Sequence, residues 1–179
     1  MMFTRIIATA LALTASVAPA TGSWAKPAGP KGLERLEGEL SAPKTPFVDE
    51  KGMQTNIDTF EGKILVLNFW ATWCNPCTKE MPSLDRLAAR LPSDTFAVVA
   101  VSQDNGGVAV AKPFLDRIGV HGLAIYADPN RRLSREFGVR GFPTTFLIGR
   151  EGTVIGRLEG AIEWDRKDVV AYLLSLAQR

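Results

Sequence analysis

The chain has 179 residues, a formal net charge of +2, two cysteines and one histidine. This length suits a single hydrophobic core. The near-balanced charge, with no stripe of basic residues, gives no indication of a nucleic-acid partner.

The first 25 residues carry one charge, Arg5, ahead of an apolar run from 6 to 17. Ala18-Pro19-Ala20 is a small-x-small cleavage site, and Ser23-Trp24-Ala25 is a second candidate. A membrane span needs about 20 apolar residues, so the run is short for that purpose. We predict an export signal at 1–20, or extending to 25, with an uncleaved inner-membrane anchor as the alternative.

Residues 21–44 are predicted to be a linker followed by a short helix. Proline and glycine recur between Lys26 and Gly32, and both residue types interrupt regular structure. Leu33, Leu36 and Leu40 have the spacing of one helical stripe. The main domain is expected over 45–179.

A buried strand is predicted at 64–70, where seven consecutive positions are mostly apolar. The segment from Cys74 to Cys77 then begins a helix whose apolar face comprises Met81, Leu84, Leu87, Ala88 and Leu91. Two thiols therefore lie in a first helical turn, where unpaired N–H groups and the helix dipole favour a thiolate.

Spacing assigns the two thiols different roles. Cys74, at the start of the helix, is the predicted attacking thiol, and Cys77, one turn deeper, is the predicted resolving thiol. Pro76 fits the first helical turn. A structural disulfide or half of a zinc site is the alternative, but a zinc site needs about four ligands and the chain adds only His121. We assign His121 no role.

The flanking elements alternate between strand and helix. A hairpin with Gly52 at its turn is predicted before the central strand. Strands are predicted at 96–101, 123–126, 144–148 and 153–158. Helices are predicted at 108–118, between an N-cap at Asp128 with Pro129 and a stop at Gly138, and at 164–177. The last helix is expected to bury Val169, Val170, Leu173 and Leu174. This order indicates an α/β sandwich with helices on both faces of a sheet.

Two separated motifs resemble the thioredoxin superfamily. The first is the stretch Val66–Cys77, and its continuation Thr78–Pro82, with Glu80 and Pro82 in place, resembles the TlpA-like branch that includes ResA. The second, Phe137–Ile148, is similar to the family's cis-proline region. The resemblance covers roughly 45 to 178. It implies a thioredoxin fold with an N-terminal β-hairpin and a central αβ insertion near 108–127.

The resemblance also implies further site residues. Pro143 is expected to be cis and to lie against the dithiol, whereas an ordinary trans-proline opening a strand is the alternative. Glu80, three positions after Cys77 and seven after Trp73, is expected on the same helical face as both. There it could exchange the Cys77 proton, with partial burial raising its pKa; the alternative is a solvated surface glutamate. The expected substrate-binding residues are Trp73, Pro76, Phe142, Pro143 and Thr144.

Asn68 stands where thioredoxins carry a buried acid. An asparagine cannot exchange a proton at neutral pH, so Glu80 is the expected replacement. Trp70, two positions further on, is expected in the core or at the sheet edge.

The implied function is a periplasmic thiol-disulfide oxidoreductase that mainly reduces client proteins, in cytochrome c or copper-site assembly. The resemblance implies a membrane thiol-disulfide electron donor, no metal and no cofactor beyond the Cys74–Cys77 dithiol. One alternative is net oxidation of client thiols. Another is a copper-binding chaperone, although such chaperones carry Cys-x-x-x-Cys and this chain carries Cys-x-x-Cys. Peroxidases of the fold set their cysteine in a different motif.

Overall fold

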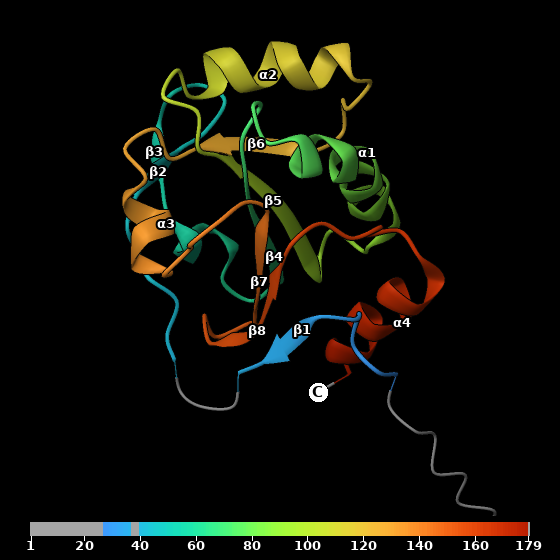
Figure 1. Cartoon of the computed structure of the whole chain (residues 1–179). Coiled ribbons are helices and arrows are strands. Elements are labelled where there is room, and N and C mark those ends of the chain that lie inside the picture. The colour runs from blue at the N-terminus through green and yellow to red at the C-terminus, as the bar shows by residue number, and fades with distance from the viewer. Residues whose placement is uncertain (1–26, 37–39, 179) are drawn as a thin grey trace, which may run out of the picture.

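The computed structural model describes residues 27–36 and 40–178 (Figure 1). The predicted export signal at 1–20, and its alternatives, fall outside these residues. Within the described part, no helix has the length and apolar character that crossing a membrane requires.

One eight-stranded sheet runs through the molecule in the order β1-β8-β7-β4-β5-β6-β2-β3. The central strands β4, β5 and β6 are parallel, while β7 and β8 continue the sheet antiparallel. The strands are β1 (Leu33–Arg35), β2 (Phe47–Val48), β3 (Gln54–Thr55), β4 (Ile64–Trp70), β5 (Phe96–Ser102), β6 (Ala124–Ala127), β7 (Thr144–Ile148) and β8 (Val154–Glu159). The mixed sheet flanked by helices confirms the predicted α/β class.

Alternation along β4 divides the core between the two faces of the sheet. Leu65, Leu67 and Phe69 face one side, where η1 (Ile57–Phe60) and α3 (Arg132–Glu136) pack. Ile64, Val66 and Trp70 face the other side. That side is covered by α1 (Asn75–Arg90), α2 (Val108–Arg117) and α4 (Lys167–Leu176). Figure 1 shows α1 and α4 across the sheet from α3.

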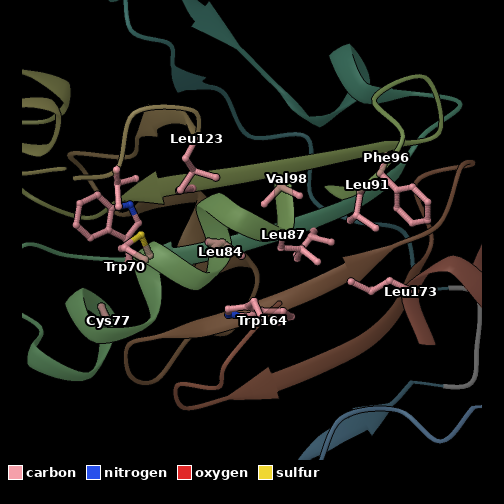
Figure 2. Packing of buried hydrophobic residues seen from close by; sticks show 14 of the residues in the cluster. Trp70, Cys77, Leu84, Leu87, Leu91, Phe96, Val98, Leu123, Trp164 and Leu173 are labelled. Carbon is pink, nitrogen blue, oxygen red and sulfur yellow. The ribbon is translucent and has the colours of Figure 1, made fainter. Parts of the chain in front are cut away.

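The face under α1 holds the two largest fully buried side chains of the described residues. Trp70 and Trp164 are both buried, and Leu84 and Leu87 of α1 pack into the same cluster (Figure 2). Removing apolar area of this kind from water contributes roughly 25 cal/mol per Å². Helix α1 is therefore fixed to the sheet along its apolar face, and Trp70 belongs to the core.

The prediction of a short helix near Leu33 is wrong. Residues 33–35 form β1, which pairs antiparallel with β8 so that Leu33 lies opposite Leu158. The edge of β8 offers hydrogen bonds and an apolar contact, and this outweighs a weak helical spacing. The Arg35 guanidinium also lies over the Tyr172 ring of α4, at 5.7 Å. The folded unit therefore includes residues well before 45.

Two further boundaries differ from prediction. Helix α3 begins at Arg132, because the Asp128 carboxylate accepts hydrogen bonds from the N–H groups of Arg132 and Ser134 and so caps it from a preceding turn. Helix α4 begins at Lys167, and Leu174 on its outer side is exposed. The predicted hairpin at Gly52 and the helix ending before Gly119 are confirmed, with both glycines at positive φ.

Candidate active site at the start of helix α1

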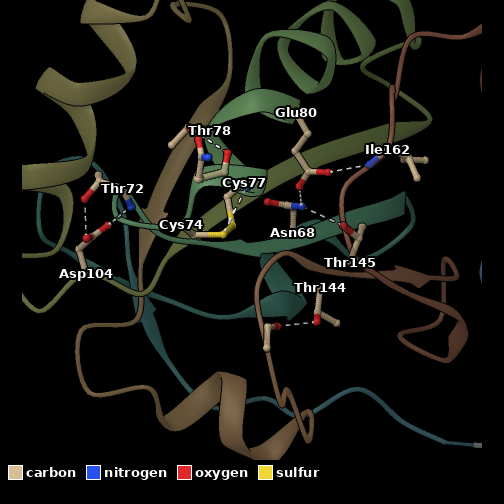
Figure 3. The surroundings of a disulfide bond; sticks show 12 residues. Asn68, Thr72, Cys74, Cys77, Thr78, Glu80, Asp104, Thr144, Thr145 and Ile162 are labelled. Atoms are coloured by element: carbon tan, nitrogen blue, oxygen red, sulfur yellow. Dashed lines mark hydrogen bonds between the residues drawn. A yellow bond between two sulfur atoms is a disulfide. The ribbon is translucent and has the colours of Figure 1, made fainter.

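Cys74 and Cys77 are joined by a disulfide, with their Cα atoms 5.2 Å apart. Cys74 is the N-cap of α1, and its Sγ accepts a hydrogen bond from the Cys77 N–H at 3.3 Å. The chain leaves β4 and enters the 16-residue helix α1 here, so both sulfurs lie at the N-terminal, positive end of the helix dipole (Figure 3).

The two cysteines differ in exposure. Cys74 is 7% exposed and Cys77 is fully buried, while Asn75 and Pro76 between them are exposed. Cys74, at the helix start, is therefore the more accessible of the two cysteines.

A buried aspartate holds the turn before the dithiol. Both Asp104 carboxylate oxygens accept hydrogen bonds from Thr72, one from its N–H and one from its hydroxyl, and Ser102 donates a third. The sequence analysis missed Asp104. Its position just after β5 was a usable signal, because the carboxyl ends of neighbouring parallel strands meet at one edge of the sheet.

Glu80 is buried on the inner side of α1, with 2% of its surface exposed. One carboxylate oxygen accepts from Asn68 Nδ2 at 2.9 Å, and the other accepts from the Ile162 N–H at 3.2 Å and from Trp164 Nε1 at 3.1 Å. Burial raises the pKa of Glu80 from 4.5 to about 7, and these three donors oppose the rise. A carboxyl group with this pKa can take or release a proton near neutrality.

Asn68 links this carboxylate to the sheet. Its Nδ2 also donates to Thr145 Oγ1 at 2.9 Å, so one amide holds β4, β7 and α1 together. Ser83 adds a further link, because its hydroxyl accepts from the Trp164 N–H at 3.0 Å. The sequence analysis missed Ile162 and Trp164 as partners of Glu80, and Thr145 as a partner of Asn68, since nothing local to them signals these contacts.

On the outer side, Trp73 is 61% exposed and packs against Phe142, with ring centroids 5.8 Å apart. Trp73 precedes α1, so it does not share a helical face with Cys77 and Glu80, and that prediction is wrong. The contact instead joins the dithiol turn to the loop before β7.

The peptide bond between Phe142 and Pro143 is cis, as predicted. The Thr144 hydroxyl donates to the Gly141 carbonyl at 2.8 Å, and the Pro143 carbonyl accepts from the Gly160 N–H at 2.9 Å. Pro143 and Thr144 are buried, whereas Phe142 is half-buried. Of these three predicted substrate-binding residues, Phe142 is therefore the one whose side chain reaches the surface.

His121 is exposed, and its ring lies 3.4 Å from the Asp116 carboxylate, away from the dithiol turn in sequence and contacts. Within residues 27–36 and 40–178, no three His, Cys, Asp or Glu side chains gather closely enough to hold a metal ion.

A redox-capable cysteine pair at a helix start, on a mixed sheet of this topology, defines the class: a thioredoxin-fold thiol-disulfide oxidoreductase. Residues 39–157 match the AhpC/TSA family. The chain is 31% identical over 140 residues to the thiol-disulfide oxidoreductase ResA of Bacillus thuringiensis subsp. konkukian, covering 78% of this chain and 79% of the relative. It belongs to the AhpC/TSA family and, within it, to the ResA-like thiol-disulfide oxidoreductases.

Two further comparisons agree. The ResA of Bacillus subtilis is 32% identical over 131 residues, which covers 73% of this chain and 72% of that protein. The crystal structure of a thiol:disulfide interchange protein DsbE from Chlorobium tepidum superposes with a TM-score of 0.69 and is 29% identical. It covers 79% of this chain and 99% of that one.

Proposed function

We propose that this chain acts mainly as a reductase of client-protein disulfides in the periplasm. Cys74 attacks, Cys77 resolves, and Glu80 exchanges the Cys77 proton. The observation that supports this proposal best is the buried Glu80 carboxyl, three positions beyond Cys77, with its pKa raised to about 7.

The reaction begins with the reduced chain. The Cys74 thiolate attacks a client disulfide, forming a mixed disulfide and releasing one client sulfur as a thiolate. Cys77 then attacks Cys74 Sγ, which releases the second client thiolate and leaves the Cys74–Cys77 disulfide seen here. Two electrons pass to the client, and a dithiol electron donor in the membrane returns them.

Glu80 provides a proton acceptor for the buried Cys77 thiol. A fully buried thiol has no water to take its proton, yet only its thiolate attacks well. The Glu80 carboxylate accepts that proton, and its pKa near neutrality lets it release the proton afterwards.

Client binding is assigned to the outer side. The exposed Trp73, which precedes Cys74, and the half-buried Phe142 form an aromatic pair, and the exposed Pro76 extends the apolar surface. Pro143 and Thr144 support this surface from below through the loop contacts already described.

The proposed clients are proteins whose cysteines must be kept reduced after export, in cytochrome c or copper-site assembly. The similarity to ResA supports the chemistry, and the predicted export signal supports the location. The membrane donor follows because the compartment outside the inner membrane is oxidising.

Reduction potential separates net reduction from net oxidation. We expect equilibration with a glutathione redox buffer to give a value between about −270 and −200 mV, in the range of thioredoxins and glutaredoxins. A value above about −150 mV would favour oxidation of client thiols instead.

A further inference from the structure

Arg131 adopts a backbone conformation that its residue type disfavours. With φ at 52° and ψ at 31°, it is the one non-glycine residue at positive φ among those that the structure describes. Glycine takes this left-handed region freely and asparagine tolerates it, whereas a long side chain makes it costly. Such strain persists where the surrounding structure holds it, and it concentrates at functional sites.

The side chain of Arg131 lies over the aromatic pair beside the dithiol. Its Cζ is 5.7 Å from the centre of the Trp73 ring and 6.0 Å from that of Phe142. The ring faces attract the cation and fix its position. A fixed positive charge therefore lies on the same outer surface to which we assign client binding.

This guanidinium has donors without an acceptor. Its Nε is buried with no hydrogen-bond partner, and no carboxylate of the described residues forms an ion pair with it. Arg157 also has a buried Nε without a hydrogen-bond partner, but its guanidinium pairs with Glu159, whereas that of Arg131 has no carboxylate partner among the described residues. A guanidinium that stacks through its face still presents N–H groups at its edge, in the geometry that fits a carboxylate.

We propose that Arg131 is a specificity-determining residue that binds a carboxylate of the client segment next to the client's reactive cysteine. The proposal rests on the reductase function proposed above and adds a preference for acidic client segments. A purely conformational role for Arg131 does not account for the side chain, because glycine or asparagine would meet the same backbone demand more readily.

Three matched peptides test this preference. Each carries one disulfide, flanked by glutamate, glutamine or lysine at the same position, and the reduced chain is mixed with each at low salt. We expect the glutamate peptide to react about tenfold faster than the lysine peptide, and high salt to reduce this ratio. Arg131→Asn, which keeps the backbone conformation, should bring the ratio close to one, while Arg131→Lys should keep part of it.

Two controls separate the possible failures. Bis(2-hydroxyethyl) disulfide, a small neutral substrate, reports the dithiol chemistry alone, and its rate should stay within about twofold in Arg131→Asn. Arg135→Asn removes the same charge from an exposed α3 position without such contacts, and it should leave the peptide ratio intact.

Three outcomes would overturn the proposal. The ratio of the glutamate-peptide rate to the lysine-peptide rate could be near one in the wild-type chain, it could be unchanged in Arg131→Asn, or it could fall as much in Arg135→Asn as in Arg131→Asn. A slowed neutral substrate in Arg131→Asn would also count against it, because the residue would then act on the dithiol itself. If the wild-type chain reduces no disulfide at all, the proposed reductase function fails instead.

Discussion

The two sulfurs of this protein lie three residues apart in the sequence but face different surroundings. Cys77 is fully buried on the inner side of α1, as is Glu80, whose carboxylate is held by Asn68, Ile162 and Trp164. Cys74 lies at the rim, where Trp73 is exposed beside Phe142.

This difference suggests a division of labour. Burial gives a carboxyl group a pKa near neutrality, which suits proton exchange, whereas recognition of client segments needs an accessible surface. The first helical turn of α1 allows both, because it joins the core to the surface within one turn. Changes on the inner side should therefore alter pH dependence, and changes on the outer side should alter client preference.

The largest effect is expected from Cys77→Ser. Without a resolving thiol the mixed disulfide persists, so turnover should fall at least about a thousandfold and the client should stay bound to Cys74. Non-reducing gels and mass spectrometry of the trapped species measure this and identify the client. Cys74→Ser is the matched control and should trap nothing; trapping by Cys74→Ser instead would reverse the two roles.

Glu80→Gln should slow the resolving step about 100-fold at pH 7, at the lower end of what a positioned proton acceptor contributes. The dependence of the rate on an ionisation near pH 7 should also disappear. Stopped-flow rates between pH 5 and 9 measure both. Glu163→Gln, the same change at an exposed position, is the control. An unchanged profile in Glu80→Gln would remove Glu80 from the mechanism.

The ionisation of Glu80 should also make the free energy of unfolding depend on pH. Folding raises the Glu80 pKa from 4.5 to about 7, so the native state keeps a proton that the unfolded chain releases across this interval. The free energy of unfolding is then highest, for this group, below pH 4.5 and falls as pH rises through 7. The loss is about 2–4 kcal/mol at 1.4 kcal/mol per pH unit. Urea titrations of the oxidised protein should show this slope, and Glu80→Gln should flatten it.

Trp164→Phe should have a smaller effect. It removes the indole N–H that donates to Glu80, so the pKa of Glu80 should rise further and the ionisation in the rate profile should move to higher pH. Lost packing and a lost hydrogen bond should cost about 1–3 kcal/mol. Leu84→Ala costs a similar amount or more through packing alone, so its profile should not move. A shift of equal size in Leu84→Ala would show that the donor is not the cause.

The smallest effect on the protein itself is expected from Trp73→Ala. Because the side chain is mostly exposed, the free energy of unfolding should change by no more than about 0.5 kcal/mol. KM for a client peptide should rise several-fold with kcat little changed, since binding area is lost rather than chemistry. Met53→Ala, another exposed apolar side chain, should leave KM alone. Equal KM values in both variants would contradict client binding at Trp73.

Local patterns were sufficient to predict the strand at 64–70, the dithiol at the helix start and the turn glycines. Each depends on neighbours within a few positions. The hydrogen bonds of Glu80 and Asn68 could not be predicted, for the same reason. Ile162 and Trp164 reach Glu80, and Thr145 reaches Asn68, only after the chain has folded across the sheet.

Three errors arose where a local pattern was applied beyond the element that it describes. Leu33 showed a helical spacing, but pairing with β8 decided its conformation. Trp73 counts seven positions back from Glu80, yet the helix begins at Asn75, so a helical count does not apply to it. Asp128 was recognised as a cap, but the intervening turn through Arg131 moved the start of α3.

The strand β1 has a practical consequence for handling the protein. Without β1, the six-residue strand β8 would be the edge of the sheet, with unpaired backbone N–H and C=O groups on which another chain can add a strand. A version cut back to residue 45 would lose this cover and should be prone to self-association. Recombinant forms that begin at residue 27 or earlier keep β1 over the edge of β8.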